Sequence, residues 1–216
     1  MSAILEVQTA RVPPSLTQRV RASAALALMV WVLGLVATGS LSAQATAGSL
    51  AAAAAAQVGV TTGYDGSYRR LAYPGGDVPV ETGVCTDVLI RALRRLDIDL
   101  QVAVHLDMRT NFQEYPKAWG LQRTDRNIDH RRVPNLETYF QRQGWSVDAS
   151  TESFEPGDIV SWRLESGLPH VGILSTQRVG DRPLVIHNIG AGVQEEDVLH
   201  AWRKVGHYRI PAARLP

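Results

Sequence analysis

The sequence predicts an α+β domain in which a helix led by a cysteine packs on an antiparallel sheet, and two stretches of the chain predict it. In GVCTDVLIRALRRL, which begins at Gly83, apolar residues recur at helical spacing. From Glu155 onward the chain instead shows short apolar runs separated by turns, namely IVSWRL, HVGILS, LVIHNI and VGHYRI, as antiparallel strands do. A helical segment followed by a group of strands is typical of α+β domains.

A basic and then apolar region precedes this domain. Arginines come before an apolar stretch over residues 22–37, and small residues with an Ala-Gln-Ala pattern follow it. This order is typical of a secretory signal, whereas an uncleaved anchor is the alternative because the stretch is at the short end for a membrane span. We expect residues 1–45 to be a signal peptide or N-terminal membrane anchor, 46–60 an Ala-rich linker and 61–216 one folded domain. The protein is then exported to the periplasm or cell envelope, and the anchor alternative would tether it to the inner membrane.

Charge and motif content exclude several classes of partner. The 22 basic and 21 acidic residues nearly balance, so nothing indicates a nucleic-acid binder. The sequence has neither an HExxH pattern nor paired cysteines at zinc spacing, and we therefore expect no metal and no other cofactor. Scattered His and Asp residues leave a metal site as a weaker alternative, for which Asp129-His130 is too sparse a signal.

Cys85 is the only cysteine of the chain. Proteins of oxidising compartments usually carry cysteines in pairs, so a lone thiol there is either a small buried apolar side chain or a reactive group. The turn-rich segment YPGGDVPVETG prevents the helix from beginning much earlier than Cys85. The unpaired N–H groups and positive dipole end of a helix start lower a thiol pKa. We therefore expect Cys85 to be a reactive thiol.

Two consecutive predicted strands, HVGILS and LVIHNI, each carry a histidine. His170 opens one strand and His187 lies within the next. Nucleophilic thiol catalysis needs an imidazole base together with a further polar group that fixes the tautomer of that ring, and this pair of histidines can supply both. Spacing alone leaves four competing histidines, which are His105, His130, His200 and His207.

Longer motifs then resemble known families. PGDIVSW, LPHVGIL and VIHNIGAG resemble motifs of the NlpC/P60 branch of papain-like cysteine peptidases. YDGSY, YPGGDVP, GVCTDVLIRALR, NIDHRRVPNL and HNIGAG together resemble the bacterial family catalogued as domain of unknown function 1287, over about Tyr64 to Ile210. The resemblance implies a papain-like fold of the NlpC/P60 type, with the nucleophile at a helix N-terminus packed on an antiparallel sheet, and makes residues 61–216 a papain-like hydrolase domain.

The resemblance also implies roles for single residues. Cys85 is then the nucleophile, His170 the base and His187 the orienting third member. NlpC/P60 proteins tend to place a Tyr and a Gly-Gly about a dozen residues before the cysteine, and Tyr73 occupies that position. We expect the Tyr73 hydroxyl to form an oxyanion hole with the Cys85 N–H, and packing of the ring against the turn is the alternative. Thr86-Asp87 departs from the usual Ser-Gly after the cysteine, so substrate contacts are expected to differ there.

The segment NIDHRRVPNL offers donors and acceptors of both signs, and an Arg can engage a carboxylate bidentately. We expect it to line the cleft beside Cys85 and to bind a zwitterionic or carboxylated ligand, with a salt-bridged supporting loop as the alternative. The acidic run that begins at Glu195 is expected to be a solvated loop or helix start and is assigned no chemistry. The expected substrate-binding residues are Asp87, Asn127, Asp129, His130, Arg131 and Asn188.

The expected reaction is hydrolysis of an amide bond by attack of the Cys85 thiolate, with His170 as base. The expected substrate is a peptide of peptidoglycan or another envelope amide, because the related peptidases cut peptide stems of the wall. Acyl transfer at the same site is one alternative. A non-catalytic envelope-binding module is another, against which the intact Cys, His, His set argues.

Overall fold

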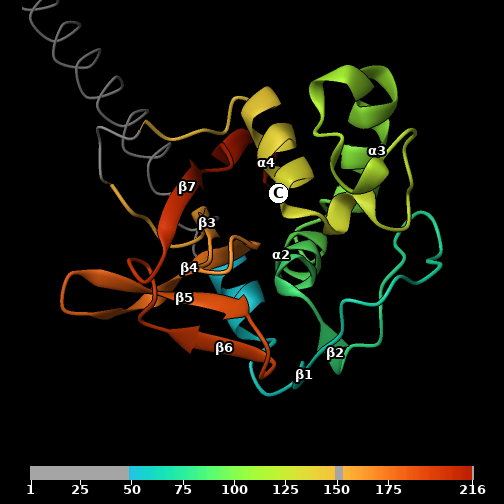
Figure 1. Ribbon diagram of the computed structural model, residues 1–216. Helices are drawn as coiled ribbons and strands as arrows, with labels where there is room; N and C mark the ends of the chain where they lie inside the picture. The colour runs from blue at the N-terminus through green and yellow to red at the C-terminus, as the bar shows by residue number, and fades with distance from the viewer. Residues whose placement is uncertain (1–48, 149–152, 216) are drawn as a thin grey trace, which may run out of the picture. The chain divides into compact units, whose positions relative to one another are not determined.

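The computed structural model describes residues 49–148 and 153–215, in which α-helices pack on a five-stranded antiparallel sheet (Figure 1). The α+β class predicted from the sequence is thus confirmed. The expected signal peptide or anchor, residues 1–45, lies outside the described residues. Within residues 49–148 and 153–215, none of the helices has the length and apolar character needed to cross a membrane.

Two of the helices pack on the sheet and another packs on those two, and the helix ends follow local sequence signals. α2 begins at the expected cysteine, and Asp99 caps α3 by accepting the Gln101 N–H. Pro134 lies in the first turn of α4, where a backbone N–H would have no partner within the helix, so the N–H that proline lacks is not missed. The helices are α2 (Cys85–Arg94), α3 (Leu100–Thr110) and α4 (Val133–Arg142), with 3-10 turns η1 (Phe112–Glu114), η2 (Ala118–Gly120), η3 (Asp129–Arg131) and η4 (Ala212–Arg214).

The sheet has the strand order β6-β5-β4-β3-β7. Four of the strands match the apolar runs of the sequence, whereas β6 occupies the acidic segment that was expected to be a loop or helix start. The strands are β3 (Ile159–Arg163), β4 (Pro169–Val179), β5 (Arg182–Asn188), β6 (Val193–Glu196) and β7 (Arg203–Tyr208). A short parallel pair, β1 (Gly63–Tyr64) with β2 (Thr82–Gly83), stands beside the start of α2.

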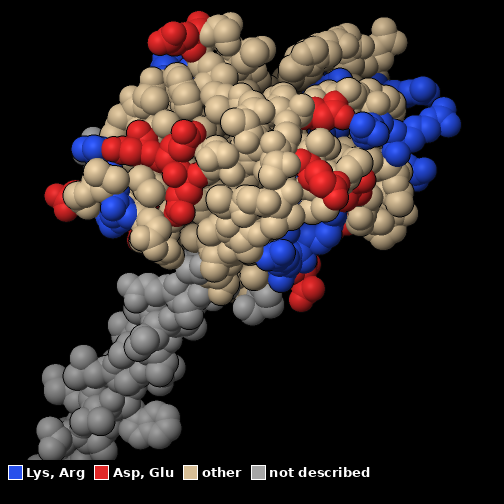
Figure 2. All heavy atoms as spheres, turned by 90° about the horizontal axis from the view of Figure 1, so that it is seen from below, with Lys and Arg blue, Asp and Glu red and all other residues tan. Residues whose placement is uncertain are grey.

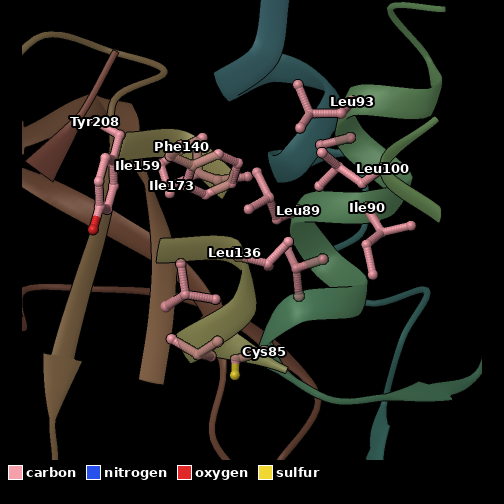
Figure 3. Packing of buried hydrophobic residues seen from close by; sticks show 14 of the residues in the cluster. Cys85, Leu89, Ile90, Leu93, Leu100, Leu136, Phe140, Ile159, Ile173 and Tyr208 are labelled. Carbon is pink, nitrogen blue, oxygen red and sulfur yellow. The ribbon is translucent and has the colours of Figure 1, made fainter. Parts of the chain in front are cut away.

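The core lies between the helices and one face of the sheet. α2 packs on β4 and β5, and α4 packs on β4 and β7. Figure 3 shows Leu89 and Phe140 from the helices meeting Ile173 from the sheet. Alternate strand residues such as Leu174 point to the opposite face, where a smaller apolar cluster includes Trp162. The sheet is therefore buried on both faces, which holds its strands in a fixed register.

We expected an Ala-rich linker over residues 46–60, but the part of this segment that the structure describes is a packed helix followed by a turn. Residues 49–55 are helical, and Leu50 and Ala54 are buried in the main core. Gln57 adds a hydrogen bond of 2.8 Å from Nε2 to the Val88 carbonyl of α2. Alanine side chains are small enough to let this helix approach α2 closely, so the segment belongs to the domain rather than leading up to it.

Candidate functional site

Cys85 is the first residue of α2 and follows β2 directly. Val84 before it is extended, with φ −114° and ψ 179°, so the chain turns from strand to helix at the cysteine. At Gly83 a Cβ would lie 3.1 Å from the Asp87 carboxylate, so any side chain there would have to push that carboxylate aside. Cys85 is buried, and Figure 3 shows its sulfur at the edge of the core, pointing away from the apolar cluster. The predicted position of Cys85 at a helix N-terminus is thus confirmed.

The cleft into which the cysteine faces also contains His170. It has a volume of about 550 Å³ and is lined by residues from β1, the start of α2, the segment 119–133 and the start of β4. Large apolar side chains at its rim are exposed to solvent, which is uncommon for so many in one place. The lining residues that matter below are Tyr64, Cys85, Trp119, Arg131, Arg132, Leu168, His170 and Ile189.

His170 starts a chain of hydrogen bonds that leads away from the cleft. Its Nε2 lies 2.9 Å from Nδ1 of His187, and Nε2 of His187 lies 2.9 Å from Oε2 of Glu196. The two rings come together because β4 and β5 approach closely at Gly172, where a Cβ would lie 2.5 Å from a Val185 methyl group. Among the described residues, no hydrogen bond joins the Cys85 sulfur to His170. Nδ1 of His170 is the ring nitrogen that remains for the cleft.

Burial makes both Cys85 and His170 neutral at rest. It raises the pKa of the Cys85 thiol to about 11, against hydrogen bonding from the Val171 N–H, and the charge of Asp87 raises it further. Burial likewise lowers the pKa of His170 to about 3, with His187 adding to the effect. The expectation that the helix start would lower the thiol pKa is therefore wrong in direction, because removal from water outweighs the helix dipole.

Tyr73 does not lie at this cleft, and the expectation that it forms an oxyanion hole is not supported by its position. Its ring packs edge-on against His105 of α3 at 5.5 Å between ring centroids and lies under the Arg126 guanidinium, whereas the alternative expected packing against the turn. Tyr64 is the tyrosine that lines the cleft. Burial raises its pKa, and the nearby charges of Cys85 and Asp87 raise it further. The parallel pairing of Tyr64 with Gly83 brings this side chain next to Cys85.

Asp87 and Arg131 form a buried ion pair rather than two free substrate contacts. Arg131 donates from Nε and Nη2 to the two carboxylate oxygens at 2.8 and 2.9 Å. Asp87 also accepts the Val84 N–H at 2.6 Å, which satisfies a donor at the start of α2. Asp87 is therefore a structural residue, whereas Arg131 both supports the helix and lines the cleft.

The other expected substrate-binding residues are mostly structural. Asn127 accepts the Leu71 N–H and lines a different hollow, beside Tyr68. Asn188 is buried and donates to the carbonyls of Gly63 and Gly83, so it joins β5 to the β1–β2 pair. These contacts give both amides a structural role, and neither residue lines the cleft beside Cys85.

Asp129 and His130 are also buried, outside the cleft. Burial raises the pKa of Asp129 to about 6 and lowers that of His130 to about 4. Of the segment NIDHRRVPNL, the side chains that do line the cleft are Ile128, Arg131, Arg132 and Val133. The loop thus serves partly as the supporting structure that was the alternative and partly as a wall of the cleft.

The competing histidines lie elsewhere. His207 donates from Nε2 to the buried carboxylate of Asp158 at 2.7 Å, and Arg209 donates to the same carboxylate. His105 packs on Tyr73, and His200 meets Phe154 edge-on. Across residues 49–148 and 153–215, no three His, Cys, Asp or Glu side chains gather as a metal site would need.

Glu196 and Tyr64 are the residues at the site that the sequence analysis missed. A hairpin joins β5 to β6, and its register pairs His187 with Gln194 and Val185 with Glu196. Glu196 thus lies on the same face of the sheet as His187, diagonally across the two strands. The spacing of the hairpin in the sequence could have indicated this contact. Tyr64 had no such signal, because a two-residue strand pairs it with a segment about twenty residues away.

Comparison with known proteins gives a family and two distant structures. The family model described as domain of unknown function (DUF1287) matches residues 51–210. The Escherichia coli (strain K12) protein named "Uncharacterized protein YijF" is 58% identical over 164 residues, which cover 74% of this chain and 80% of that protein. NlpC1 from Trichomonas vaginalis is 20% identical with a TM-score of 0.38, over 72% of this chain and 42% of its own. NlpC2 from the same organism is 18% identical with a TM-score of 0.37, over 75% of this chain and 46% of its own.

The chain thus spans less than half the length of these two structures. The family match, in contrast, covers most of the described residues and includes Cys85, His170 and His187. The chain belongs to the family described as domain of unknown function 1287.

Proposed function

We propose that the protein is a cysteine hydrolase that cleaves an amide bond, with Cys85 as nucleophile and His170 as base. The observation that carries the proposal is that a helix-start cysteine and a strand-borne histidine line one cleft, with the histidine held by a further imidazole. The sulfur bonds to the carbonyl carbon and its proton passes to His170. The C–N bond then breaks as His170 returns the proton to the leaving amine, and water finally cleaves the acyl-enzyme.

Burial decides when the proton moves. With a thiol pKa of about 11 and an imidazole pKa of about 3, the pair rests as thiol and imidazole at neutral pH. An ion pair at rest would place two charges where little water reaches. The proposal is therefore that proton transfer accompanies the attack, so that the imidazolium forms together with the negative charge of the reacting carbonyl, which offsets it.

The negative charge on the carbonyl oxygen needs donors. The N–H groups of the first turn of α2 have no partner within the helix, and the backbone N–H of Cys85 is among them. Tyr64, which lines the cleft, takes the part that the sequence analysis gave to Tyr73. A hydroxyl and a backbone N–H at this position would together form an oxyanion hole.

The side chains around the cleft indicate which groups the substrate carries near the scissile amide. Exposed Trp119, Leu168 and Ile189 surround it with apolar surface. Arg132 lies over the Trp119 ring at 4.6 Å, and its buried Nη1 has no hydrogen-bond partner among the described residues. A substrate with an apolar group beside the scissile amide and a carboxylate that reaches Arg132 would satisfy both features.

Contacts inside the cleft, rather than electrostatic attraction by the charge of the whole protein, would select this substrate. Figure 2 shows acidic side chains both at the left and right of the centre of one face, with Lys and Arg mainly at the right, so neither sign of charge dominates the face. The formal net charge is only +1. The proposed substrates are peptides of peptidoglycan, which carry free carboxylates, and export by the N-terminal segment would bring the domain to them.

The test uses the chain from residue 49 onward, with Cys85→Ala, His170→Ala and the control His105→Ala. Peptidoglycan fragments are incubated with each protein, and newly formed amino groups are identified by mass spectrometry. Cleavage by the wild type and the control, and none by the other two variants, supports the proposal. Cleavage that survives Cys85→Ala would refute it.

Acyl transfer is the second candidate, favoured by the apolar rim and by the exclusion of water from Cys85. An apolar acyl group would suit this cleft, and a poorly hydrated acyl-enzyme would react slowly with water. Adding an amine acceptor decides between the two: a constant product rate supports hydrolysis, whereas a rate that rises with the acceptor and yields its acyl product supports transfer.

A further inference from the structure

We infer that Glu196 is a positioning residue that sets the order of protons through His187 and His170, so that Nδ1 of His170 is the nitrogen that accepts the proton of Cys85. The inference rests on the proposed function of Cys85 and His170 and extends it by one residue. It follows from two distances of 2.9 Å, between His170 Nε2 and His187 Nδ1 and between His187 Nε2 and Glu196 Oε2.

The proton order follows from what each atom can do. An ionised carboxylate only accepts hydrogen bonds, so Nε2 of His187 must carry the proton that faces Glu196. In a neutral ring the other nitrogen then holds a lone pair, so Nδ1 of His187 accepts from Nε2–H of His170. Nδ1 of His170 is consequently left unprotonated. The reverse order would turn the lone pair of His187 Nε2 toward a carboxylate oxygen of Glu196, with no proton between them.

Both imidazoles are neutral, which the deduction requires. Burial lowers the pKa of His170, and the neighbouring His187 lowers it further. Burial also lowers the pKa of His187, while the charge and hydrogen bond of Glu196 oppose that change. Because His170 is 2% and His187 0% exposed, water has little access to replace either partner and allow another tautomer.

Aromatic side chains hold the two rings in this geometry. The Trp202 ring lies at 5.6 Å from His170 and 6.0 Å from His187, measured between ring centroids. Trp162 lies 6.0 Å from His170 on the neighbouring strand. Turning either ring over would put carbon atoms where the paired nitrogens lie and break the 2.9 Å contact between the rings. With both rings in this orientation, the direction of the chain depends on its last member.

Glu196 can be replaced without opening the core. It lies on the edge strand β6, and its side chain is 47% exposed, in contrast to 1% for His187. A change of hydrogen-bonding type at this position therefore tests the proton order while the packing around the rings stays the same.

Three variants distinguish an effect of the proton order from an effect of the charge at this position. Glu196→Lys presents only donors, so we expect the order to reverse and Nδ1 of His170 to become protonated. Glu196→Gln removes the charge but keeps a carbonyl oxygen, so we expect the original order. Gln194→Lys changes the charge by the same amount as Glu196→Gln at the exposed residue paired with His187 in the register, and it controls for charge alone.

The first readout is the tautomer of His170 and His187, from long-range ¹H–¹⁵N NMR spectra of the chain labelled at histidine. The second is the rate of Cys85 alkylation by iodoacetamide at pH 8, with His170→Ala for comparison. We expect Nε2–H on both rings in the wild type, Glu196→Gln and Gln194→Lys. In Glu196→Lys we expect Nδ1–H on both rings and loss of alkylation to the rate of His170→Ala.

A wild-type His170 protonated on Nδ1, or tautomers unchanged in Glu196→Lys, would overturn the inference, and the wild-type spectrum is decisive even if that variant fails to fold. A different result would overturn the proposed function instead. In that case the tautomers change as described, but alkylation of Cys85 is the same with and without His170.

Discussion

Single side chains at this site are governed by how much water reaches them as well as by their type. Cys85 stands at a helix start, where the dipole favours a thiolate, yet burial raises its pKa to about 11. Asp129 is buried with one carboxylate oxygen lacking a partner among the described residues, and burial raises its pKa to about 6. Burial thus makes both groups harder to ionise than their positions in the sequence suggest.

Asp129→Asn is expected to stabilise the domain at pH 7.5. The folded pKa of about 6 lies above the unfolded value, so ionisation opposes folding, and stability is lost as pH rises from about 4 through 6. Asn keeps the size and loses the charge, so urea unfolding should show a gain of about 1 to 3 kcal/mol at pH 7.5 that shrinks at pH 4.5. A loss of stability at pH 7.5 would contradict this account.

Asp125→Asn is the matched comparison for that experiment. Burial raises the pKa of Asp125, but hydrogen bonds from Asn127 and Tyr68 lower it by more. Its ionised form therefore favours folding, with stability lost as pH falls through the folded pKa. We expect Asp125→Asn to lower the free energy of unfolding at pH 7.5, opposite in sign to Asp129→Asn.

Tyr64→Phe is expected to reduce kcat/KM on the order of 100-fold, because it removes one oxyanion donor and keeps the ring. Tyr73→Phe should leave kcat/KM unchanged, since the Tyr73 ring packs on His105 outside the cleft. Steady-state kinetics on a peptide cleaved by the wild type gives both values. Equal effects of the two substitutions would remove Tyr64 from the proposed mechanism.

At the scale of elements, the start of α2 is held by segments that are distant in sequence. The pair Asp87–Arg131 joins it to η3, and Asn188 joins β5 to the strands just before it. Arg91 donates to the carbonyls of Val78 and Thr82 and so orders the turn-rich segment upstream. The position of the cysteine is therefore determined by buried polar contacts rather than by helix propensity.

Asp87→Ala is expected to lower the free energy of unfolding by about 3 to 5 kcal/mol, because it leaves the Arg131 guanidinium buried without its partner. Replacing both residues, Asp87→Leu with Arg131→Met, should cost less than Asp87→Ala alone. Arg182→Ala breaks the more exposed pair with Asp197 and should cost less than about 1 kcal/mol. Chemical denaturation of the four proteins decides. If the double variant were the least stable, the ion-pair explanation would be wrong.

At the scale of the whole molecule, the folded domain includes the Ala-rich segment before residue 61. Leu50 is 1% and Ala54 0% exposed, and both belong to the core that contains Cys85. Gln57 reaches the Val88 carbonyl within α2. A helix at the start of the domain thus supports the element that carries the proposed nucleophile.

A chain that begins at residue 61 is expected to be much less stable than one that begins at residue 49, since it exposes the core surface that Leu50 and Ala54 cover. Leu50→Ala in the longer chain should lower the free energy of unfolding by about 2 to 5 kcal/mol. Val58→Ala, at an exposed position, is the control. Thermal unfolding measures all four. Equal melting temperatures for the two chain lengths would restore the linker interpretation.

The sequence by itself determined the helix that carries the cysteine, four strands of the main sheet and the family. The start of α2 at Cys85, the four apolar strands and the placement of His170 and His187 on neighbouring strands all follow from periodicity and turn residues. Such signals lie in consecutive residues, so a single stretch of chain is enough to read them. The motifs around them predicted the family that the comparison confirms.

Only the tertiary structure decided which polar groups meet. Tyr64 rather than Tyr73 lines the cleft because a two-residue parallel pairing brings it beside Cys85, and Glu196 meets His187 through the register of a hairpin. Asp87 is structural because Arg131, 44 residues away, occupies its carboxylate. Burial, which sets the protonation of Cys85 and His170, is likewise a property of the packed chain. The contacts of Tyr64 and Asp87 depend on how distant segments pack, and no local pattern of residues records that.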